Sequence, residues 1–328
     1  MIGFISIFIL FLQTTASSSE AVEPEFSRVI VPVVDLRSET KDAPPDSYFH
    51  DPLEESQILF GEKVQVFESR GDWVRVEAVA QKEFTHVKAW QGYPGWVRQS
   101  ALGVWPSTDP SARFVVRRSW ASLYSSPSGS ARKFMEIPFG SRIDVLSRKG
   151  NRVEIRYQDG RPAWMRASDL EPFDRKDSPN TIAIKVWRNA KSFIGVPYYW
   201  GGLSAYGAAC RTATTGVDCS GLTHLAYRVA GVAIPRDSHE QWMKSIPLTR
   251  SQLRRGDLVF LANAAKPDKV SHVAMYVGGE FLIEGPGTGL KVHRVTFKKK
   301  LGRRLAQIES GDTVGEKVVY FGRPIPQD

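Results

Sequence analysis

Cysteine is scarce in this 328-residue chain, which contains only Cys210 and Cys219. Two cysteines cannot build a disulfide framework for a chain of this length, so the core has to form by ordinary apolar burial. These cysteines and the six histidines are also dispersed, without the close spacing of zinc ligands. The sequence therefore predicts neither a metal site nor another cofactor.

The chain opens with an apolar run that is too short to cross a bilayer, which takes about 20 residues as a helix. This run, Ile2–Leu12, has eleven residues and is followed by small ones, with Thr14-Thr15-Ala16 as a candidate cleavage site. The pattern predicts a signal peptide in residues 1–19 and export to the periplasm or cell envelope, with no membrane span after signal removal. No Lys or Arg precedes the run, so an uncleaved anchor or a wrongly chosen start codon stays open.

Acidic residues are fewer than basic ones, 35 against 44, and the formal net charge is +9. A basic balance favours acidic partners such as nucleic acid or an anionic cell wall. The Lys and Arg residues are scattered, however, apart from 298–300 and Arg303-Arg304. We therefore expect a solvated basic surface and no nucleic-acid partner. The 42% hydrophobic and 24% charged content is typical of a folded protein with two or three domains.

An internal repeat is visible in the first half of the chain, where residues 58–67 return as residues 137–146. Each copy continues through a glycine into a run of alternating apolar and polar residues. Period-two alternation between glycine turns is typical of short antiparallel strands. We interpret the copies as two small all-β barrels, residues 24–108 and 111–173.

The two copies differ in one loop. The first copy has extra residues between Val79 and Tyr93, and this segment carries Trp90. Long loops on a small barrel are common sites of added function. A solvated hairpin extension explains the same pattern, and both readings stay open.

A charged, proline-bearing linker at residues 171–179 precedes a part that mixes helix and strand signals, residues 179–328, which we expect to be one α+β domain. Within it Cys219 is followed by apolar residues at nearly helical spacing, which places it in the first turn of a helix. The helix dipole there favours a thiolate and lowers a cysteine pKa. Cys210 has no helix start behind it, so Cys219 is the candidate nucleophile.

The candidate base is His272, at the start of the predicted strand 271–278. A strand holds a side chain rigidly, as a catalytic base requires. Glu284 follows one hairpin later and could face back to orient the imidazole. A purely structural histidine at a strand edge is the open alternative.

Three ordered motifs, 218–221, 255–260 and 272–278, resemble the NlpC/P60 family of cell-wall cysteine peptidases, and the resemblance extends over about residues 180–328. It implies a papain-like fold for the third domain. The two repeats resemble bacterial SH3 (SH3b) domains. The whole arrangement resembles the γ-D-glutamyl-L-diamino-acid endopeptidases, which recycle or trim murein peptides.

The resemblance implies a role for each matching residue. Cys219 attacks the scissile carbonyl, His272 takes and returns the proton, and Glu284 orients His272. The family more often has His, Asn or Gln at this third position, so Glu284 is a departure, although a carboxylate suits an imidazolium partner. Tyr198 matches a tyrosine whose hydroxyl helps to hold the oxyanion beside the Cys219 backbone N–H. A core aromatic is the alternative for Tyr198.

The subfamily recognises the free amine of an N-terminal L-alanine, and the matching residues form a predicted substrate pocket. A carboxylate pair suits an ammonium, because a buried charge must be paired. Glu54 competes with Glu55 for the pocket position, and ordinary surface acids explain both. The predicted substrate-binding residues are Glu55, Tyr93, Ser220 and Asp237.

The sequence thus predicts an exported monomer that hydrolyses the γ-D-glutamyl–diaminopimelate bond of peptidoglycan-derived peptides through a thioester and without metal. An N-acetylmuramoyl-L-alanine amidase using the same thiol is one alternative. A non-catalytic wall-binding protein is another. An insertion-like segment, residues 204–216, holds Cys210, and a Cys210–Cys219 disulfide that switches the enzyme off is a further hypothesis.

Overall fold

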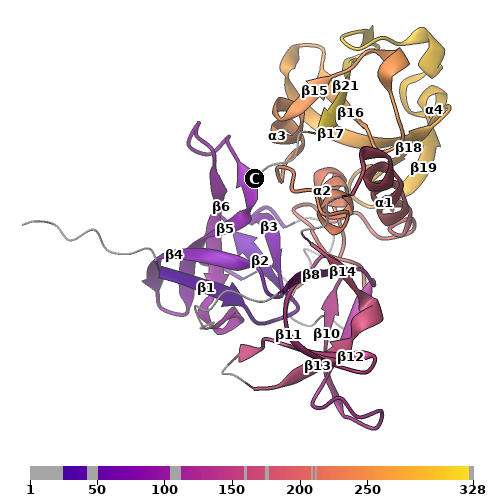
Figure 1. Cartoon of the computed structure of the whole chain (residues 1–328). Helices are drawn as coiled ribbons and strands as arrows, with labels where there is room; N and C mark the ends of the chain where they lie inside the picture. Colours follow the sequence, from indigo (N-terminus) through magenta and orange to yellow (C-terminus); the bar gives the residue numbers. More distant parts are fainter. Residues whose placement is uncertain are drawn as a thin grey trace, which may run out of the picture.

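The computed structural model of the protein describes residues 25–42, 51–103, 112–158, 161–173, 177–207, 210 and 213–324. The predicted signal peptide lies outside these residues. Within them the chain forms three sheets of seven strands each, and the four α-helices all follow residue 178. Two all-β parts followed by one mixed part agree with the predicted α+β class (Figure 1).

The first sheet is antiparallel, and its residues alternate between core and surface. Along its longest strand Val74, Val76 and Ala78 are buried while Arg75 is exposed. Its strands follow the order β3-β2-β6-β5-β4-β1-β7. Their bounds are β1 (Glu25–Val29), β2 (Val33–Arg37), β3 (Glu54–Leu59), β4 (Lys63–Arg70), β5 (Trp73–Glu83), β6 (Gln91–Arg98) and β7 (Leu102–Gly103), with a 3-10 turn η1 (Gln99–Ala101).

The second sheet repeats the first in topology, with the order β10-β9-β13-β12-β11-β8-β14. The repeated glycines Gly71 and Gly150 sit in matching hairpin turns at φ +57° and +60°, a conformation that favours glycine. The bounds are β8 (Ala112–Val116), β9 (Trp120–Tyr124), β10 (Lys133–Pro138), β11 (Arg142–Lys149), β12 (Arg152–Ile155), β13 (Ala163–Arg166) and β14 (Leu170–Pro172), with a 3-10 turn η3 (Ala167–Asp169).

Neither sheet closes into a barrel, so the predicted closure is wrong. Among the described residues the end strands β3 and β7 pair on one side only, as do β10 and β14. The strands at one end, β7 and β14, have two and three residues. A ladder that short cannot bridge to the opposite edge, because closure needs a continuous staggered register.

The third unit places a six-strand path, β15-β21-β16-β17-β18-β19, next to four helices, with β20 paired to β21. The helices are α1 (Pro179–Lys191), α2 (Cys219–Val229), α3 (Ser238–Met243) and α4 (Phe297–Leu301), with 3-10 turns η4 (Arg250–Gln252) and η5 (Leu305–Gln307). The strands are β15 (Ser245–Pro247), β16 (Leu258–Asn263), β17 (Lys266–Gly278), β18 (Phe281–Glu284), β19 (His293–Thr296), β20 (Thr313–Val314) and β21 (Lys317–Pro324).

Both faces of this third sheet are covered, which explains why its central strand is apolar without alternation. Phe260 of β16 points into the core shared with α1 and α2, and its neighbours Val259 and Leu261 point into a second core that includes Phe297 of α4. Successive side chains of a strand face opposite sides, so burial on both sides requires a continuous apolar run.

Helix α2 is buried along its whole length, because the third sheet covers one side of it and both N-terminal sheets approach the other (Figure 1). Arg228 of α2 donates to both carboxylate oxygens of Glu62, at 2.6 and 3.1 Å. From the second sheet, Gly140 approaches Leu225 so closely that a Cβ there would lie 2.6 Å from a leucine methyl. The three units therefore pack around the helix that carries Cys219.

The extra segment of the first repeat lengthens a hairpin. Strands β5 and β6 extend beyond the rest of their sheet toward α3 (Figure 1). The Arg236 N–H donates to the Lys82 carbonyl at 2.9 Å, and the Thr85 N–H donates to Glu240 Oε1 at 3.2 Å. The Lys244 ammonium lies 4.6 Å from the Trp90 ring centroid. The hairpin is thus part of a contact between units and not a freely solvated extension.

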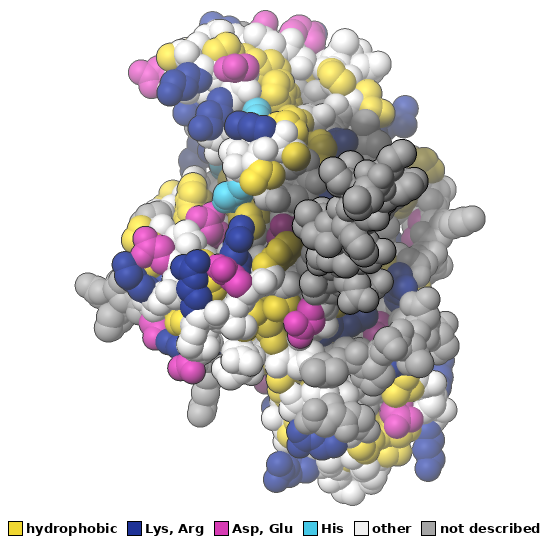
Figure 2. All heavy atoms as spheres, turned by 90° about the vertical axis from the view of Figure 1, so that its left-hand side faces the viewer, with side chains coloured by type: hydrophobic (Ala, Val, Ile, Leu, Met, Phe, Trp, Pro, Cys, Tyr) yellow, Lys and Arg dark blue, Asp and Glu magenta, His cyan; other side chains and the backbone are white. Residues whose placement is uncertain are grey.

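Charges of both signs are mixed on one face of the molecule. On the face drawn in Figure 2, Lys and Arg side chains are interspersed with Asp and Glu side chains. This distribution agrees with a solvated basic surface. In the part of the chain that the structure describes, no helix has both the length and the apolar content needed to cross a membrane.

Candidate active site

Cys219 is the first residue of α2, and Asp218 caps this helix. The Gly221 N–H donates to Asp218 Oδ1 at 2.5 Å, a standard use of Asp at a helix start. A Cβ at Gly221 would collide with the Gly202 carbonyl, so only glycine allows the helix to start this close to residues 201–202. The Asp-Cys-Ser-Gly stretch therefore sets the position of the thiol by local geometry.

The thiol is only 9% exposed, and the backbone N–H groups of Val273 and Ser220 face its sulfur. Burial, followed by the nearby carboxylate of Asp218, raises the pKa of Cys219 to about 12, against the smaller lowering by these N–H groups and Arg236. The predicted lowering of this pKa is therefore wrong. Desolvation of a charge outweighs the helix-start effect here.

His272 lies on β17 directly before Val273, so the strand that contacts the sulfur also carries the candidate base. Its Nε2 lies 2.5 Å from Glu284 Oε2 on the neighbouring strand β18. The imidazole is 17% exposed, whereas the carboxylate is 1% exposed. Because Nε2 is engaged with Glu284, proton exchange with Cys219 would go through Nδ1.

Glu284 is held ionised by more than its histidine. Burial alone would raise its pKa, but His272 and then Lys300 lower it to about 2. The Lys300 ammonium lies 2.7 Å from Glu284 Oε2, and His293 Nε2 lies 3.4 Å from Oε1. Sequence reasoning did not single out Lys300 or His293. The pairing of Glu284 with His293 across β18 and β19 becomes visible only with the strand register.

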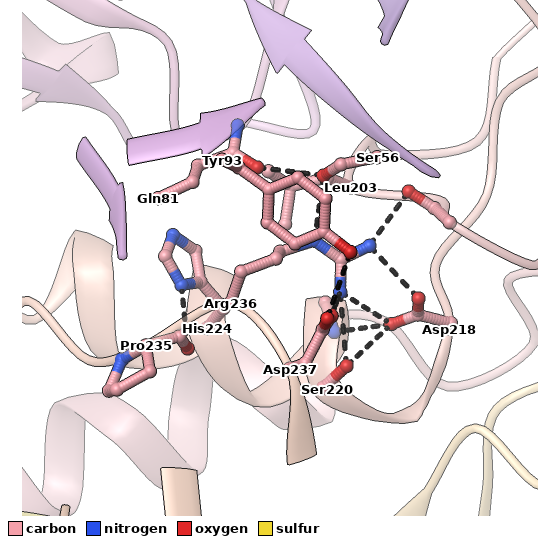
Figure 3. A network of polar contacts seen from close by, with 12 residues as sticks. Ser56, Gln81, Tyr93, Leu203, Asp218, Ser220, His224, Pro235, Arg236 and Asp237 are labelled. Atoms are coloured by element: carbon pink, nitrogen blue, oxygen red, sulfur yellow. Dashed lines mark hydrogen bonds and ion pairs between the residues drawn. The ribbon is translucent and has the colours of Figure 1, made fainter. Parts of the chain in front are cut away.

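Arg236 is the functional residue that sequence reasoning missed. Its side chain is fully buried and reaches both carboxylate oxygens of Asp218, at 3.1 and 2.9 Å, as Figure 3 shows. It also donates to Ser220 Oγ at 3.0 Å and to Ser56 Oγ of the first sheet at 2.9 Å. A planar guanidinium can serve several acceptors at once. Arg236 therefore ties the helix cap to the first sheet.

Two predicted pocket residues, Tyr93 and Asp237, meet across the junction between units. The Tyr93 hydroxyl donates to Asp237 Oδ2 at 2.9 Å (Figure 3). The enclosed position of Asp237, opposed by Arg236, raises the pKa of this carboxyl above its ordinary value. Its side chain still has 38% exposure, so a ligand can reach it. The predicted residue Ser220 instead has its hydroxyl inside the Arg236 network.

The structure separates Glu54 from Glu55. Glu54 is buried beside Arg37, at 3.7 Å, and next to Gly201. Glu55 points to the other face of β3, is partly exposed, and lies 3.7 Å from His86 Nε2. The His86 ring packs edge-on against Tyr93, with centroids 5.4 Å apart. Glu55, and not Glu54, is therefore on the side of Tyr93.

Tyr198 lies beside the nucleophile. It forms a bridge to Val217, two residues before Cys219, and it packs against the backbone near Gly285. Burial, Asp218 and Cys219 all raise the pKa of its hydroxyl, so this group stays protonated and able to donate. Cys210 forms no disulfide with Cys219 in this structure.

Comparison with known proteins points to one family. The NlpC/P60 family model matches residues 195–307. A Bacillus cereus protein named gamma-D-glutamyl-L-lysine dipeptidyl-peptidase is 32% identical over 236 residues, which cover 71% of this chain and 67% of the relative. A Bacillus subtilis protein of the same name is 28% identical over 249 residues, covering 75% and 77%.

The fold likeness extends beyond the matched domain. The crystal structure of an NlpC/P60 family protein from Bacillus cereus superimposes with a TM-score of 0.73 at 26% identity, covering 92% of this chain and all of that one. A thiol at a helix start, next to a strand whose histidine pairs with a carboxylate of the neighbouring strand, is the arrangement of a cysteine hydrolase. The chain belongs to the NlpC/P60 family.

Proposed function

We propose that this protein is a cysteine peptidase that cleaves the γ-D-glutamyl–diaminopimelate bond in peptidoglycan peptides with a free N-terminal L-alanine. The observation that carries the chemistry is that His272 pairs with Glu284 of the neighbouring strand, while Val273, the residue after His272, faces the Cys219 sulfur. Nucleophile, base and orienting group then come from three adjacent elements, as covalent catalysis requires.

In the first half-reaction the sulfur attacks the γ-carbonyl carbon of D-Glu. The raised pKa of Cys219 means that the resting thiol is protonated, so His272 takes the proton during attack. The ionised Glu284 stabilises the imidazolium that forms. The Tyr198 hydroxyl and the Cys219 N–H are the proposed donors to the oxyanion.

Collapse of the tetrahedral intermediate breaks the C–N bond. His272 returns its proton to the leaving α-amine of the third residue, and a thioester to Cys219 remains. Water then attacks the thioester carbon while His272 accepts its proton, and the Cys219 sulfur leaves with that proton. The products are a dipeptide with a free γ-carboxylate and a shortened stem peptide.

Specificity is proposed to reside in the pocket between the first and third units. The Asp237 carboxylate, with Tyr93 bonded to it, and the Glu55 carboxylate suit an ammonium ion. Ser220, whose hydroxyl accepts a hydrogen bond from Arg236, is the fourth proposed substrate-binding residue. The names of both Bacillus relatives describe release of a dipeptide, which requires recognition of a free N-terminus two residues from the scissile bond.

Those names specify L-lysine as the third residue, whereas diaminopimelate is the residue proposed here. Both present the same α-amine as leaving group, so the catalytic residues do not distinguish them. Parallel turnover of L-Ala-γ-D-Glu-L-Lys and L-Ala-γ-D-Glu-diaminopimelate decides this point.

Two other functions are disfavoured by specific observations. An amidase acts where the L-Ala nitrogen is an uncharged amide, which cannot form an ion pair with the Glu55 and Asp237 carboxylates. A non-catalytic wall-binding protein has no need of the buried Glu284 charge against His272. The two N-terminal sheets are proposed to be SH3b domains of an exported enzyme, in which the first one also forms part of the substrate pocket.

The test compares the free tripeptide with the same peptide N-acetylated on L-Ala and with intact muropeptide. We expect kcat/KM for the free tripeptide to exceed the others by about 100-fold or more, because only the free amine can pair with the Glu55 and Asp237 carboxylates. Equal turnover of all three would remove the amine pocket. Activity that survives Cys219→Ala would remove the mechanism.

A further inference from the structure

The hairpin between β5 and β6 carries a histidine, His86, that neither the catalytic residues nor the predicted pocket accounts for. Its Nδ1 lies 3.1 Å from Glu83 Oε2, and its Nε2 lies 3.7 Å from Glu55 Oε2. Glu83 is 1% exposed. One ring nitrogen thus contacts a fixed internal carboxylate, and the other faces the carboxylate that we propose for the substrate amine.

The charged and titratable groups around His86 come from every element packed against it. Glu55 belongs to β3, Glu83 to β5 and Tyr93 to β6, and the Tyr93 hydroxyl continues to Asp237 of the third unit. The residue before His86 also contacts a carboxylate, because its backbone N–H donates to Glu240 of α3. Asp237 already has the Arg236 guanidinium 3.5 Å from its Oδ1, whereas the cation beside Glu55 and Glu83 is the His86 ring.

We propose that His86 is the resident cation of the amine pocket: its imidazolium balances the carboxylates while the pocket is empty and gives up its charge when the substrate ammonium binds. This inference rests on the proposed function, because it assumes that Glu55 and Asp237 receive an amine. It makes His86 a positioning and specificity residue and not a catalytic one.

The physical reason is charge pairing in a partly closed space. Several carboxylates in one enclosed site repel each other and bind protons unless a cation lies between them. The Glu55 carboxylate is the largest cause of a raised pKa for His86, and with Glu83 it brings that pKa to about 9 against the opposing effect of burial. At neutral pH the empty pocket therefore contains an imidazolium.

Binding of an ammonium next to Glu55 places a second positive charge beside His86. The two cations repel, and Glu55 is shared, so the pKa of His86 falls in the complex. The imidazolium then loses its proton to solvent, and Glu83 keeps the neutral ring in place. By linkage, ligand binding releases protons, and affinity for the amine rises with pH until the ligand's own amine deprotonates near about pH 8.

The experiment is calorimetric titration of the full chain with the dipeptide L-Ala-γ-D-Glu, at about pH 7, in buffers of different ionisation enthalpy. This dipeptide has no scissile bond, so the readout is independent of turnover. We expect wild type to release a large fraction of a proton per dipeptide bound. His86→Gln should release markedly fewer protons than wild type, because only Asp237, whose pKa burial raises to about 7, is left to give up part of a proton to the ammonium.

The matched control is His239→Gln, a histidine on the neighbouring helix α3 whose ring packs against Trp242. It should release protons as wild type does. A second measurement follows the His86 imidazole protons by NMR in wild type and in Glu55→Gln. The midpoint should lie near pH 9 in wild type, and both the Glu55 substitution and the dipeptide should lower it. This measurement stands even if His86→Gln folds poorly.

The possible outcomes distinguish the hypothesis of an amine pocket from the hypothesis that His86 is its resident cation. If the free-amine dipeptide binds much more tightly than its N-acetyl form but wild type and His86→Gln release the same number of protons, His86 is not the resident cation and the amine pocket stands. A wild-type His86 midpoint near the ordinary value of histidine likewise overturns the role of His86 and leaves the pocket intact. If both forms of the dipeptide bind equally, amine recognition fails, and the role of His86 fails with it.

Discussion

The Arg236 guanidinium donates to both carboxylate oxygens of Asp218, the residue that caps the helix beginning with Cys219. The same guanidinium reaches Ser56 of the first sheet and the carbonyl oxygen of Gly201. One buried side chain therefore positions the nucleophile's helix, the neighbouring loop and a strand of another unit. The orientation of the thiol depends on a contact between units.

Arg236→Lys should destabilise the protein by about 3–5 kcal/mol and lower kcat more than stability alone explains, because an ammonium cannot serve the Asp218 oxygens bidentately. Thermal unfolding and steady-state kinetics on folded protein measure the two effects. Arg323→Lys is the control, since its pairing with Asp257 is at a partly exposed site. Its unfolding free energy should change by about 1 kcal/mol or less. Equal effects of both substitutions would contradict the role of Arg236.

Glu284→Gln should lower kcat by about 100-fold or more while KM changes little, because the imidazolium loses its stabilising charge. The substitution also has a pH signature. The folded-state pKa of Glu284 is lowered to about 2, so its stabilising contribution is present above the unfolded pKa of about 4.3 and is lost as pH falls toward 2.

Acid unfolding checks this sign. Across that window the wild type should lose about 3 kcal/mol more of its free energy of unfolding than Glu284→Gln does, because the variant lacks this carboxylate. Glu309→Gln, a half-exposed residue paired with Arg250, is the control and should unfold with acid as wild type does. Identical acid unfolding of Glu284→Gln and wild type would show that the carboxylate is not held ionised.

Alkylation tests the raised pKa of Cys219. Because the thiol is protonated at neutral pH, iodoacetamide should modify it slowly there. The alkylation rate should rise about tenfold per pH unit toward alkaline pH. Peptide mapping by mass spectrometry distinguishes it from Cys210, and Cys210→Ser removes that second thiol. A rate that is already maximal near neutral pH would mean that a thiolate is preformed.

Mapping of the oxidised protein also tests the proposed Cys210–Cys219 disulfide, which two unlinked thiols would exclude.

Glu62→Ala should be among the most destabilising single substitutions, by about 3–5 kcal/mol, because it leaves the buried Arg228 guanidinium without its carboxylate. Chemical denaturation measures the loss. Glu39→Ala removes an exposed ion pair with Lys41 and should cost about 1 kcal/mol or less. A small effect at Glu62 would mean that the first sheet is only loosely attached to α2.

Short-range patterns explain what the sequence predicts well. The start of α2 follows from the apolar spacing after Cys219, and the β-strands with their glycine turns follow from period-two alternation. Three ordered motifs led to the NlpC/P60 family, which the comparisons confirm. Cys219, His272 and Glu284, which the predictions grouped together, lie on adjacent elements, and the proposed roles still await experiment.

The features that the sequence does not predict depend on contacts between residues far apart in the chain. Arg236 follows Ile234 and Pro235 in an ordinary loop, and its partners come from segments up to 180 residues away. The choice between Glu54 and Glu55 depends on which face of β3 each occupies. The pKa of Cys219 depends on the depth of burial, which no local pattern records. The proposed role of His86 depends on its proximity to Glu55 of β3 and Glu83 of β5, which the sequence alone does not show.

The hairpin formed by β5 and β6 also affects how the substrate specificity of the protein can evolve. Its tip supplies His86, and its strands supply Tyr93 and the Lys82 carbonyl that receives the Arg236 N–H. Insertions and deletions in a solvent-facing turn are among the easiest changes for a gene to accept. A lineage could therefore retune which peptides are cleaved by editing a turn in a domain that contains none of the reacting groups, while the chemistry itself is passed on unaltered.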